Sequence, residues 1–308
     1  MPHAFLPILT RRPLGRAGFE VTTLTLGGAG LGGRYGPVPE DAAVQTVLRA
    51  IDLGVNYIEG SPFYGVCEQR FAKALAAIGG RPSGLHVCTK VGMHPARHGD
   101  YSAGATRWSV EESLKILGLD SVDLVQVHAT DAIDMAAVLG PHGAVGELER
   151  MRDEGKVRAI AFAIRGASYH RQAIASGRFD AILIHDDFSL IRSSDACVIA
   201  EAAAAGMGVL VGRALMTGLL AGPNPMVSAR LAAHPDAAAA LDWWRWAQER
   251  GVSLQAVALQ FAIRHMGVSS VLVGASSPRE IEENVSAATF PLPEDIWAEV
   301  DERMRRIG

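Results

Sequence analysis

The chain has 308 residues, of which 49% are hydrophobic and 20% charged, and its formal net charge is −4. This composition is that of a globular protein, and the length suits one large α/β domain or two smaller ones. The chain is slightly acidic, and its longest basic run is the pair Arg11-Arg12. We therefore expect no nucleic acid and no anionic membrane as a partner.

Targeting segments and cysteines point to one compartment. No apolar run approaches the roughly 20 residues that a membrane helix requires. The apolar stretch 5–9 is interrupted by Pro7 and is shorter than the core of a signal peptide. The cysteines Cys67, Cys88 and Cys197 form no C-x-x-C pair, which is typical of a reducing compartment. These features predict a cytoplasmic protein.

Short apolar segments alternate with helical segments along most of the chain. After a small hairpin over 14–21, we expect strands at 23–26, 55–58, 85–89, 122–127, 159–164, 181–184, 209–211 and 271–273. We expect helices at 39–51, 68–77, 105–117, 144–154, 168–176, 194–205, 237–249, 254–265, 278–287 and 294–305.

Strands that are apolar on both faces and alternate with helices predict a parallel sheet covered by helices. Eight such units in about 250 to 300 residues match a (β/α)8 barrel. We therefore predict an α/β TIM barrel with an N-terminal hairpin and C-terminal helices. No linker or repeat divides the sequence, so residues 1–308 are expected to form a single domain.

A doubly wound sheet is the alternative fold, because residues 28–33 spell G-x-G-x-x-G after the first strand. Two features argue against it. Pro37 and Pro39 separate these glycines from the next helix. Glu59, the acidic residue that ends the second strand, lies about 30 residues on rather than the expected ~20. The barrel is therefore preferred.

Four polar side chains follow the C-terminal ends of predicted strands. Glu59 ends the strand 55–58 and Tyr64 follows it in a turn, while Lys90 and His128 end the next two strands. Barrel enzymes keep their active sites at this end. A carboxylate, a phenol, an ammonium and an imidazole at that position predict a site for proton transfer.

Several motifs occur in an order that resembles the aldo-keto reductase superfamily nearly end to end. They are GVNYIE (54–59) with PFYG (62–65), CTKVG (88–92), DLVQVH (123–128), GKVRAI (155–160), and GASSP (274–278) with EEN (282–284). The segments 27–38 and 99–102 resemble the bacterial sugar-oxidising branch. That branch contains D-threo-aldose (L-fucose) 1-dehydrogenases, plant L-galactose dehydrogenase and pyridoxal 4-dehydrogenase.

The resemblance implies an NAD(P)-dependent oxidoreductase that oxidises C1 of an aldose to a lactone, with reduction of small aldehydes as the alternative. It implies that Tyr64 is the acid or base and that Lys90, Glu59 and His128 assist it. A free phenol has a pKa of about 10, and a neighbouring Lys90 would favour the phenolate. Glu59 stands where the family carries aspartate, which is one methylene shorter. His128 would hydrogen-bond the substrate oxygen.

The resemblance also implies a cofactor site. The contacts it implies are Gly28, Ala29, His185, Gly212, Leu215, Gly274, Ala275, Ser276, Arg279, Glu283 and Asn284. His185 and Gly212 stand where the family carries a glutamine and a stacking tyrosine, and its Ser-Asn pair falls at 163–164. NADP-preferring relatives hold the 2′-phosphate with a lysine and an arginine, whose places here are taken by Gly274 and Glu280. An acidic side chain repels a phosphate, so NAD is favoured, while the adjacent Arg279 keeps NADP open.

Loops that should overhang the barrel mouth carry Tyr35, Phe63, His94 and Trp108, and we predict that these residues form the wall for a small-molecule substrate. Two other classes of function stay open. Metal-dependent hydrolases also use histidines and carboxylates at strand ends, but the first strand has no H-x-H pair and Lys90 would repel a cation, so no metal is expected. A barrel that binds nucleotide with weak or no catalysis is the third class, because Glu59 and the nicotinamide positions depart from the family.

Overall fold

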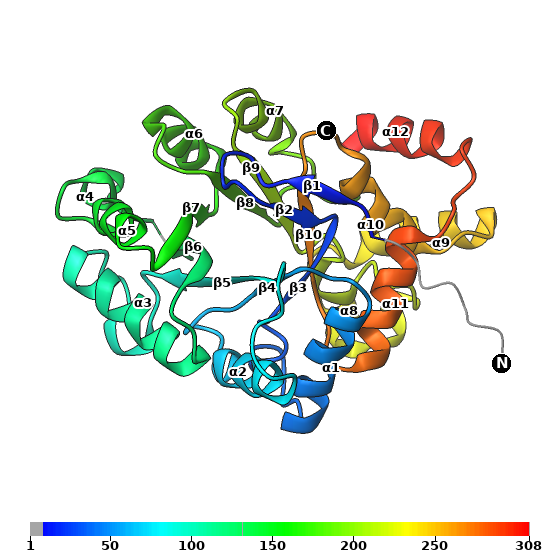
Figure 1. Ribbon diagram of the computed structural model, residues 1–308. Helices are drawn as coiled ribbons and strands as arrows, with labels where there is room; N and C mark the ends of the chain where they lie inside the picture. The colour runs from blue at the N-terminus through cyan, green and yellow to red at the C-terminus, as the bar shows by residue number, and fades with distance from the viewer. Residues whose placement is uncertain (1–8, 131, 308) are drawn as a thin grey trace.

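The structure, a computed structural model, describes residues 9–130 and 132–307. Eight parallel strands close into a barrel in the order β10-β3-β4-β5-β6-β7-β8-β9 (Figure 1). The strands are β3 (Leu24–Gly27), β4 (Tyr57–Glu59), β5 (His86–Val91), β6 (Val122–Ala129), β7 (Val157–Ile164), β8 (Ala181–His185), β9 (Gly208–Gly212) and β10 (Ser270–Gly274). The TIM-barrel fold predicted from the sequence is confirmed.

Helices surround the barrel on the outside (Figure 1). The longer ones are α1 (Glu40–Asp52), α2 (Cys67–Ala77), α3 (Ala103–Leu117), α5 (Ala144–Asp153), α6 (Ala167–Ser176), α7 (Ala196–Ala204), α9 (Ala237–Arg250), α10 (Leu254–Arg264), α11 (Pro278–Thr289) and α12 (Ile296–Ile307). The short helices α4 (Met135–Leu139) and α8 (Ala229–Ala232) and the 3-10 turns Pro95–Arg97, Met216–Gly218 and Pro225–Val227 lie in loops. Across the described residues, no helix has the length and apolar character to cross a membrane.

Helix α1 illustrates how the local sequence produces this layer. Glu40 in the first turn and Arg49 in the last have the charges that the helix dipole favours. Ala43, Val47 and Ala50 recur at helical spacing and are fully buried. Burying one valine side chain contributes about 1.5 kcal/mol or more, so this apolar stripe attaches the helix to the barrel.

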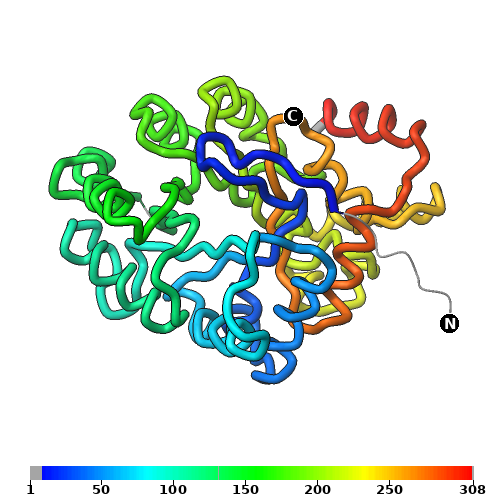
Figure 2. Tube along the Cα trace, viewed as in Figure 1, coloured from blue at the N-terminus to red at the C-terminus, as the bar shows by residue number. Residues whose placement is uncertain are grey.

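A hairpin of β1 (Arg11–Pro13) and β2 (Glu20–Thr22) closes the N-terminal end of the barrel. Leu14 is fully buried in a cluster with side chains of the barrel interior. Gly15 lies against the start of β9, where a Cβ on it would be 1.9 Å from the backbone nitrogen of Gly208. Figure 2 shows the hairpin running across the barrel strands. The loops that follow the strands are therefore left at the opposite end.

Candidate active site

Glu59, Tyr64 and Lys90 meet at the C-terminal end of the barrel. Glu59 ends β4 and Lys90 lies in β5, which pairs with β4 in parallel. Oε1 of Glu59 is 2.5 Å from Nζ of Lys90, and only 5% and 2% of their side chains are exposed. The same Nζ lies 5.0 Å from the centroid of the Tyr64 ring. All three residues line one cavity of about 460 Å³.

The turn that carries Tyr64 is held by its own backbone and by the glycine-rich loop. The Tyr64 amide donates to the Ser61 carbonyl (3.0 Å), and the Phe63 amide donates to the Ser61 hydroxyl (3.1 Å). Gly32 packs so closely on this turn that a Cβ there would lie 1.6 Å from the Tyr64 carbonyl oxygen. Only glycine permits this approach, so the loop 27–33 fixes the position of Tyr64.

The environment sets the protonation state of these side chains. Burial raises the pKa of the Tyr64 phenol; Lys90 lowers it and Glu59 raises it, and the net shift is upward. Burial lowers the pKa of Lys90, but the charge of Glu59 raises it more strongly in combination with other neighbours, so the net shift is also upward. At neutral pH the phenol is therefore protonated and the lysine is charged. Lys90 acts on Tyr64 in the direction expected from the sequence, but burial outweighs it.

His128, in β6, lies next to Tyr64. Its ring centroid is 6.1 Å from that of Tyr64 and 5.9 Å from that of Phe63. Burial, with the charge of Lys90 as the next cause, holds the pKa of His128 well below its usual value. Its Nδ1 is buried with no hydrogen-bond partner in the part of the chain that the structure describes. A neutral imidazole with a free nitrogen can donate or accept one hydrogen bond to a ligand.

The cavity also extends along the ends of β8, β9 and β10. The predicted cofactor residues that line it are Ala29, His185, Gly212, Leu215, Gly274, Ala275, Ser276, Glu283 and Asn284. Gly28 is not among the lining residues, and a Cβ on it would be 2.2 Å from the buried Cys67 sulfur. Arg279 is also outside the lining; it is exposed, and its Nε donates to Glu283 Oε1 (2.7 Å).

The residues predicted for the substrate wall divide into two groups. Tyr35 lines the cavity, and Phe63 contacts both His128 and the Arg34 guanidinium, which is 4.2 Å from its ring centroid. His94 and Trp108 instead pack on each other, with ring centroids 4.5 Å apart, and neither lines the cavity. The structure therefore brings only the first two next to Tyr64.

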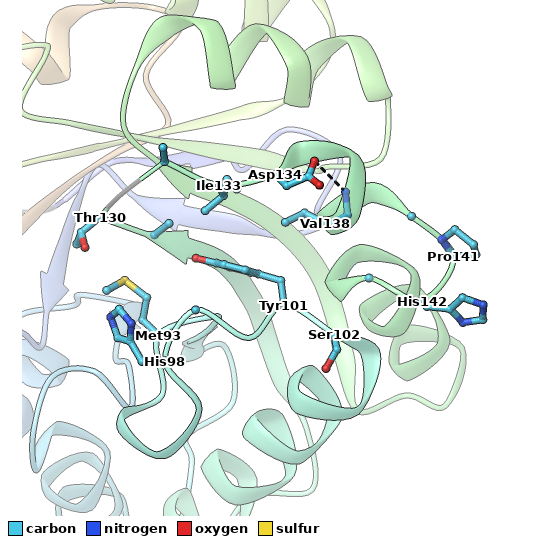
Figure 3. Close-up of a pocket in the computed structure, with 16 residues that line it drawn as sticks. Met93, His98, Tyr101, Ser102, Thr130, Ile133, Asp134, Val138, Pro141 and His142 are labelled. Atoms are coloured by element: carbon cyan, nitrogen blue, oxygen red, sulfur yellow. Dashed lines mark hydrogen bonds between the residues drawn. The ribbon is translucent and has the colours of Figure 1, made fainter.

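A second cavity, of about 610 Å³, lies between the loop that follows β5 and the loop that contains α4 (Figure 3). Apolar side chains such as Ile133 line much of it, and the Tyr101 ring extends along its wall. The Tyr101 hydroxyl donates to the His128 carbonyl oxygen (2.8 Å), and His98 lies 6.1 Å from the Phe63 ring. Two residues of this cavity, Tyr101 and His98, thus contact residues that lie next to Tyr64.

Four polar residues line the first cavity that are not among those discussed from the sequence: Arg213, Thr217, Arg230 and Gln255. Arg213 directly follows Gly212, the last residue of β9. The sequence feature that could have identified Arg213 is its position as a charged residue just after the C-terminal end of a predicted strand. Among the described residues, no group of histidines, cysteines and acids is arranged to hold a metal ion.

Unpaired polar atoms test whether the cavity fits a nicotinamide dinucleotide. Nδ1 of His185 and Nε of Arg213 belong to lining residues and are buried without a hydrogen-bond partner in the described ranges. A polar ligand would satisfy them. Gly274 faces open space, since a Cβ there would meet no atom within 4 Å, whereas at Gly212 it would lie 3.2 Å from the His185 ring. The walls fit a dinucleotide, with His185 occupying the space beside Gly212.

Comparison with known proteins gives consistent matches. The profile of the Aldo/keto reductase family matches residues 23–305. The chain is 32% identical over 289 residues to L-galactose dehydrogenase from Arabidopsis thaliana, covering 90% of this chain and 88% of that protein. It is 28% identical over 318 aligned positions to D-threo-aldose 1-dehydrogenase from Pseudomonas sp., covering 93% and 95%. Its fold is similar to that of a glycerol dehydrogenase from Gluconobacter oxydans, with a TM-score of 0.77, 24% identity and coverage of 96% and 95%.

Proposed function

The chain belongs to the aldo/keto reductase family and is an NAD(P)-dependent oxidoreductase of small molecules, and we propose that it oxidises C1 of an aldose to a lactone with NAD. The observation that carries this proposal is the contact of Tyr64 with the buried Glu59–Lys90 ion pair in the cavity wall. The substrate class is supported by two relatives that are named as dehydrogenases of sugars, L-galactose dehydrogenase and D-threo-aldose 1-dehydrogenase.

The chemistry requires a proton acceptor next to the departing hydride. When bound, the nicotinamide cofactor supplies the hydride acceptor. As the hydride leaves C1, the deprotonated Tyr64 oxygen takes the proton of the C1 hydroxyl, and the C1–O bond becomes the carbonyl of the lactone. Lys90 stabilises the phenolate, and Glu59 keeps that ammonium charged and in place. The neutral imidazole of His128 donates a hydrogen bond to the substrate oxygen.

The protonated state of Tyr64 favours a second candidate, the reduction of small aldehydes. Its raised pKa means that the proton-donating form is present at neutral pH. In that direction Tyr64 gives its proton to the carbonyl oxygen as hydride reaches the carbon. Oxidation needs the deprotonated form, so its rate should increase with pH while reduction proceeds at neutral pH.

We infer the preference for NAD from charges at the β10 end of the cavity. The Glu280 carboxylate accepts a hydrogen bond from the Ser276 amide (2.8 Å) at the N-terminus of α11. That helix end would otherwise attract a phosphate, but it already holds an anion. Glu283 neutralises Arg279 through its ion pair (2.7 Å). A 2′-phosphate would add a further negative charge beside these carboxylates.

The test is the absorbance of reduced nicotinamide after mixing purified protein with NAD or NADP and L-fucose, L-galactose, D-arabinose or pyridoxal. Small aldehydes with reduced cofactor test the opposite direction. Tyr64→Phe should lower kcat by about 10²-fold or more, since it removes the acid–base group. Tyr169→Phe is the matched control, because the Tyr169 hydroxyl bonds the Ile133 backbone instead (3.2 Å). Turnover in Tyr64→Phe within tenfold of the wild type would refute the mechanism. Cofactor binding with no turnover of any substrate would identify a nucleotide-binding barrel instead.

We also propose that residues 1–308 form one domain in a cytoplasmic protein. The single barrel supports the first point. The second is supported by Cys67, Cys88 and Cys197, which are free thiols. One cooperative unfolding transition, seen alike by circular dichroism and tryptophan fluorescence, is expected for one domain. Cell fractionation tests the location.

A further inference from the structure

Arg213 lies on the barrel rim between the two ends of the cavity. It follows β9, whose last residue Gly212 pairs with His185 of β8 on one side and with Leu272 of β10 on the other. The β10 side leads to the wall formed by 274–276. A side chain that enters the cavity from β9 is therefore placed between groups from β8 and groups from β10.

Two hydrogen bonds hold the Arg213 guanidinium in position. Nη1 donates to Asp186 Oδ2 (2.7 Å), and Nη2 donates to the Thr217 hydroxyl (3.3 Å). Asp186 is only 4% exposed and also lies 2.9 Å from Nη2 of Arg165. The third nitrogen, Nε of Arg213, is buried without a hydrogen-bond partner among the described residues. The side chain is thus oriented before any ligand arrives, which lowers the entropic cost of binding.

The cluster keeps an excess of positive charge. Arg165 and Arg213 share the carboxylate of Asp186, and the carboxylate of Asp187 interacts with Arg165. His185 beside them is neutral at pH 7, because burial lowers its pKa, Arg213 adds to this, and Asp186 only partly opposes it, giving about 4. Arg230 lines the same cavity and donates to the Thr217 carbonyl (3.2 Å). This part of the wall attracts an anion, whereas the β10 end carries two glutamates.

The backbone of this cluster is strained. Asp186, Arg213 and Thr217 have φ values of 75°, 62° and 54°, in the left-handed region that residues other than glycine rarely adopt. Each such residue costs on the order of 1 kcal/mol or more, and such strain persists mainly at functional sites. Arg213 hydrogen-bonds both of the others, and Met216 (φ 49°), which precedes Thr217, is the remaining non-glycine residue of the described chain in this region.

We propose that Arg213 binds the diphosphate of the dinucleotide and that Asp186 is the positioning residue that directs it. The inference rests on the proposed function, since it requires a dinucleotide in the cavity. The diphosphate is the anion that joins the two nucleosides, which matches a cation placed between the β8 and β10 sides. An arginine presents a planar fork of donors that pairs with phosphate oxygens more specifically than a lysine does.

The experiment is isothermal titration of the full chain with NAD, ADP-ribose and adenosine, which differ in whether they contain a diphosphate. Arg213→Met should weaken ADP-ribose binding by about 10-fold or more, as expected for a lost charge-assisted bond, and leave adenosine binding within twofold. In Arg213→Met, the affinity for ADP-ribose should also decrease less steeply with added salt than it does in the wild type. Arg213→Lys should recover part of the affinity, and Asp186→Asn should weaken ADP-ribose but not adenosine.

Arg165→Met is the matched control, because Arg165 carries the same charge and touches Asp186 but does not line the cavity. The affinity of Arg165→Met for ADP-ribose should stay within twofold of that of the wild type. Equal losses for adenosine and ADP-ribose in Arg213→Met, or an equal effect of Arg165→Met, would overturn the assignment. Unchanged ADP-ribose affinity in a folded Arg213→Met protein would overturn it too. If the wild type itself bound neither NAD nor ADP-ribose, the proposed function would fail instead.

Discussion

The carboxylate of Glu59 lies 2.5 Å from the ammonium of Lys90, and almost no part of either side chain reaches solvent. Two charges withdrawn from water in this way depend on each other, since removing one partner leaves the other buried and unpaired. The pair therefore does two things for Tyr64. It keeps a positive charge 5.0 Å from the ring, and it prevents Lys90 from turning elsewhere.

Glu59→Asp should lower kcat by about tenfold, because the shorter side chain moves the carboxylate away from Lys90 by about one C–C bond length of ~1.5 Å. KM for the cofactor should stay within twofold. Steady-state kinetics with the best substrate of the panel measure both values. A rise in kcat would show that the longer acid is a handicap. Glu59→Gln should in addition lower the free energy of unfolding by about 3–5 kcal/mol, as measured by urea denaturation.

Two glycine substitutions separate stability from activity. A Cβ on Gly32 would lie 1.6 Å from the Tyr64 carbonyl oxygen, and one on Gly15 would lie 1.9 Å from the Gly208 nitrogen. Gly32→Ala and Gly15→Ala should both lower the free energy of unfolding, by about 1–3 kcal/mol each. Only Gly32→Ala should also lower kcat, since it displaces the turn of Tyr64. An equal kcat in the folded fractions of both variants would contradict this division.

The stability of the protein should fall with acid in a window set in part by His185. The pKa of His185 is lowered from about 6.5 in the unfolded chain to about 4 in the folded one, so between these values the unfolded state binds more protons. Its contribution to stability is complete above pH 6.5 and is lost as the pH falls toward 4. Urea titrations at pH 7 and pH 5 should show a smaller difference in His185→Gln than in the wild type. If the difference between the free energies of unfolding at pH 7 and pH 5 were the same in His185→Gln as in the wild type, groups other than His185 would cause the acid sensitivity.

Cofactor preference should respond to Glu280. Glu280→Gln keeps the size of the side chain but removes the charge next to the Ser276 amide. The ratio of kcat/KM for NAD to that for NADP should fall by about 3- to 10-fold, mainly through KM for NADP, because a 2′-phosphate is no longer repelled. Glu302→Gln, on the exposed surface of α12, is the charge-matched control and should leave the ratio unchanged. A constant ratio in both variants would show that residues other than Glu280 determine the preference between NAD and NADP.

Much of the fold is readable in the alternation of short apolar segments with amphipathic helices. The segment 122–127 is apolar enough to predict a buried strand, and β6 contains it. The short helices α4 and α8 are not predicted, because at this length a helix depends on its surroundings rather than on a repeating pattern. Trp243 and Trp246 are buried in α9 and belong to the core.

The site is less readable because its properties depend on contacts between distant residues. Position in the chain is enough to place Glu59, Tyr64 and Lys90 together, since parallel strands bring their C-terminal ends to one rim. It cannot show that burial outweighs Lys90 in setting the pKa of Tyr64. Nor can it show that Arg213 is held by Asp186, which lies 27 residues earlier and on another strand end.

The hairpin that closes the other end of the barrel has a practical consequence. Its contacts, such as that of Gly15 with the start of β9, lie where none of the proposed catalytic side chains do. Libraries for directed evolution can therefore randomise the loops at the mouth of the barrel. The hairpin end is kept unchanged, so that its contacts continue to stabilise the fold. Affinity tags or a solid support are best attached on the hairpin side, where they leave the diffusion of substrate into the barrel unobstructed.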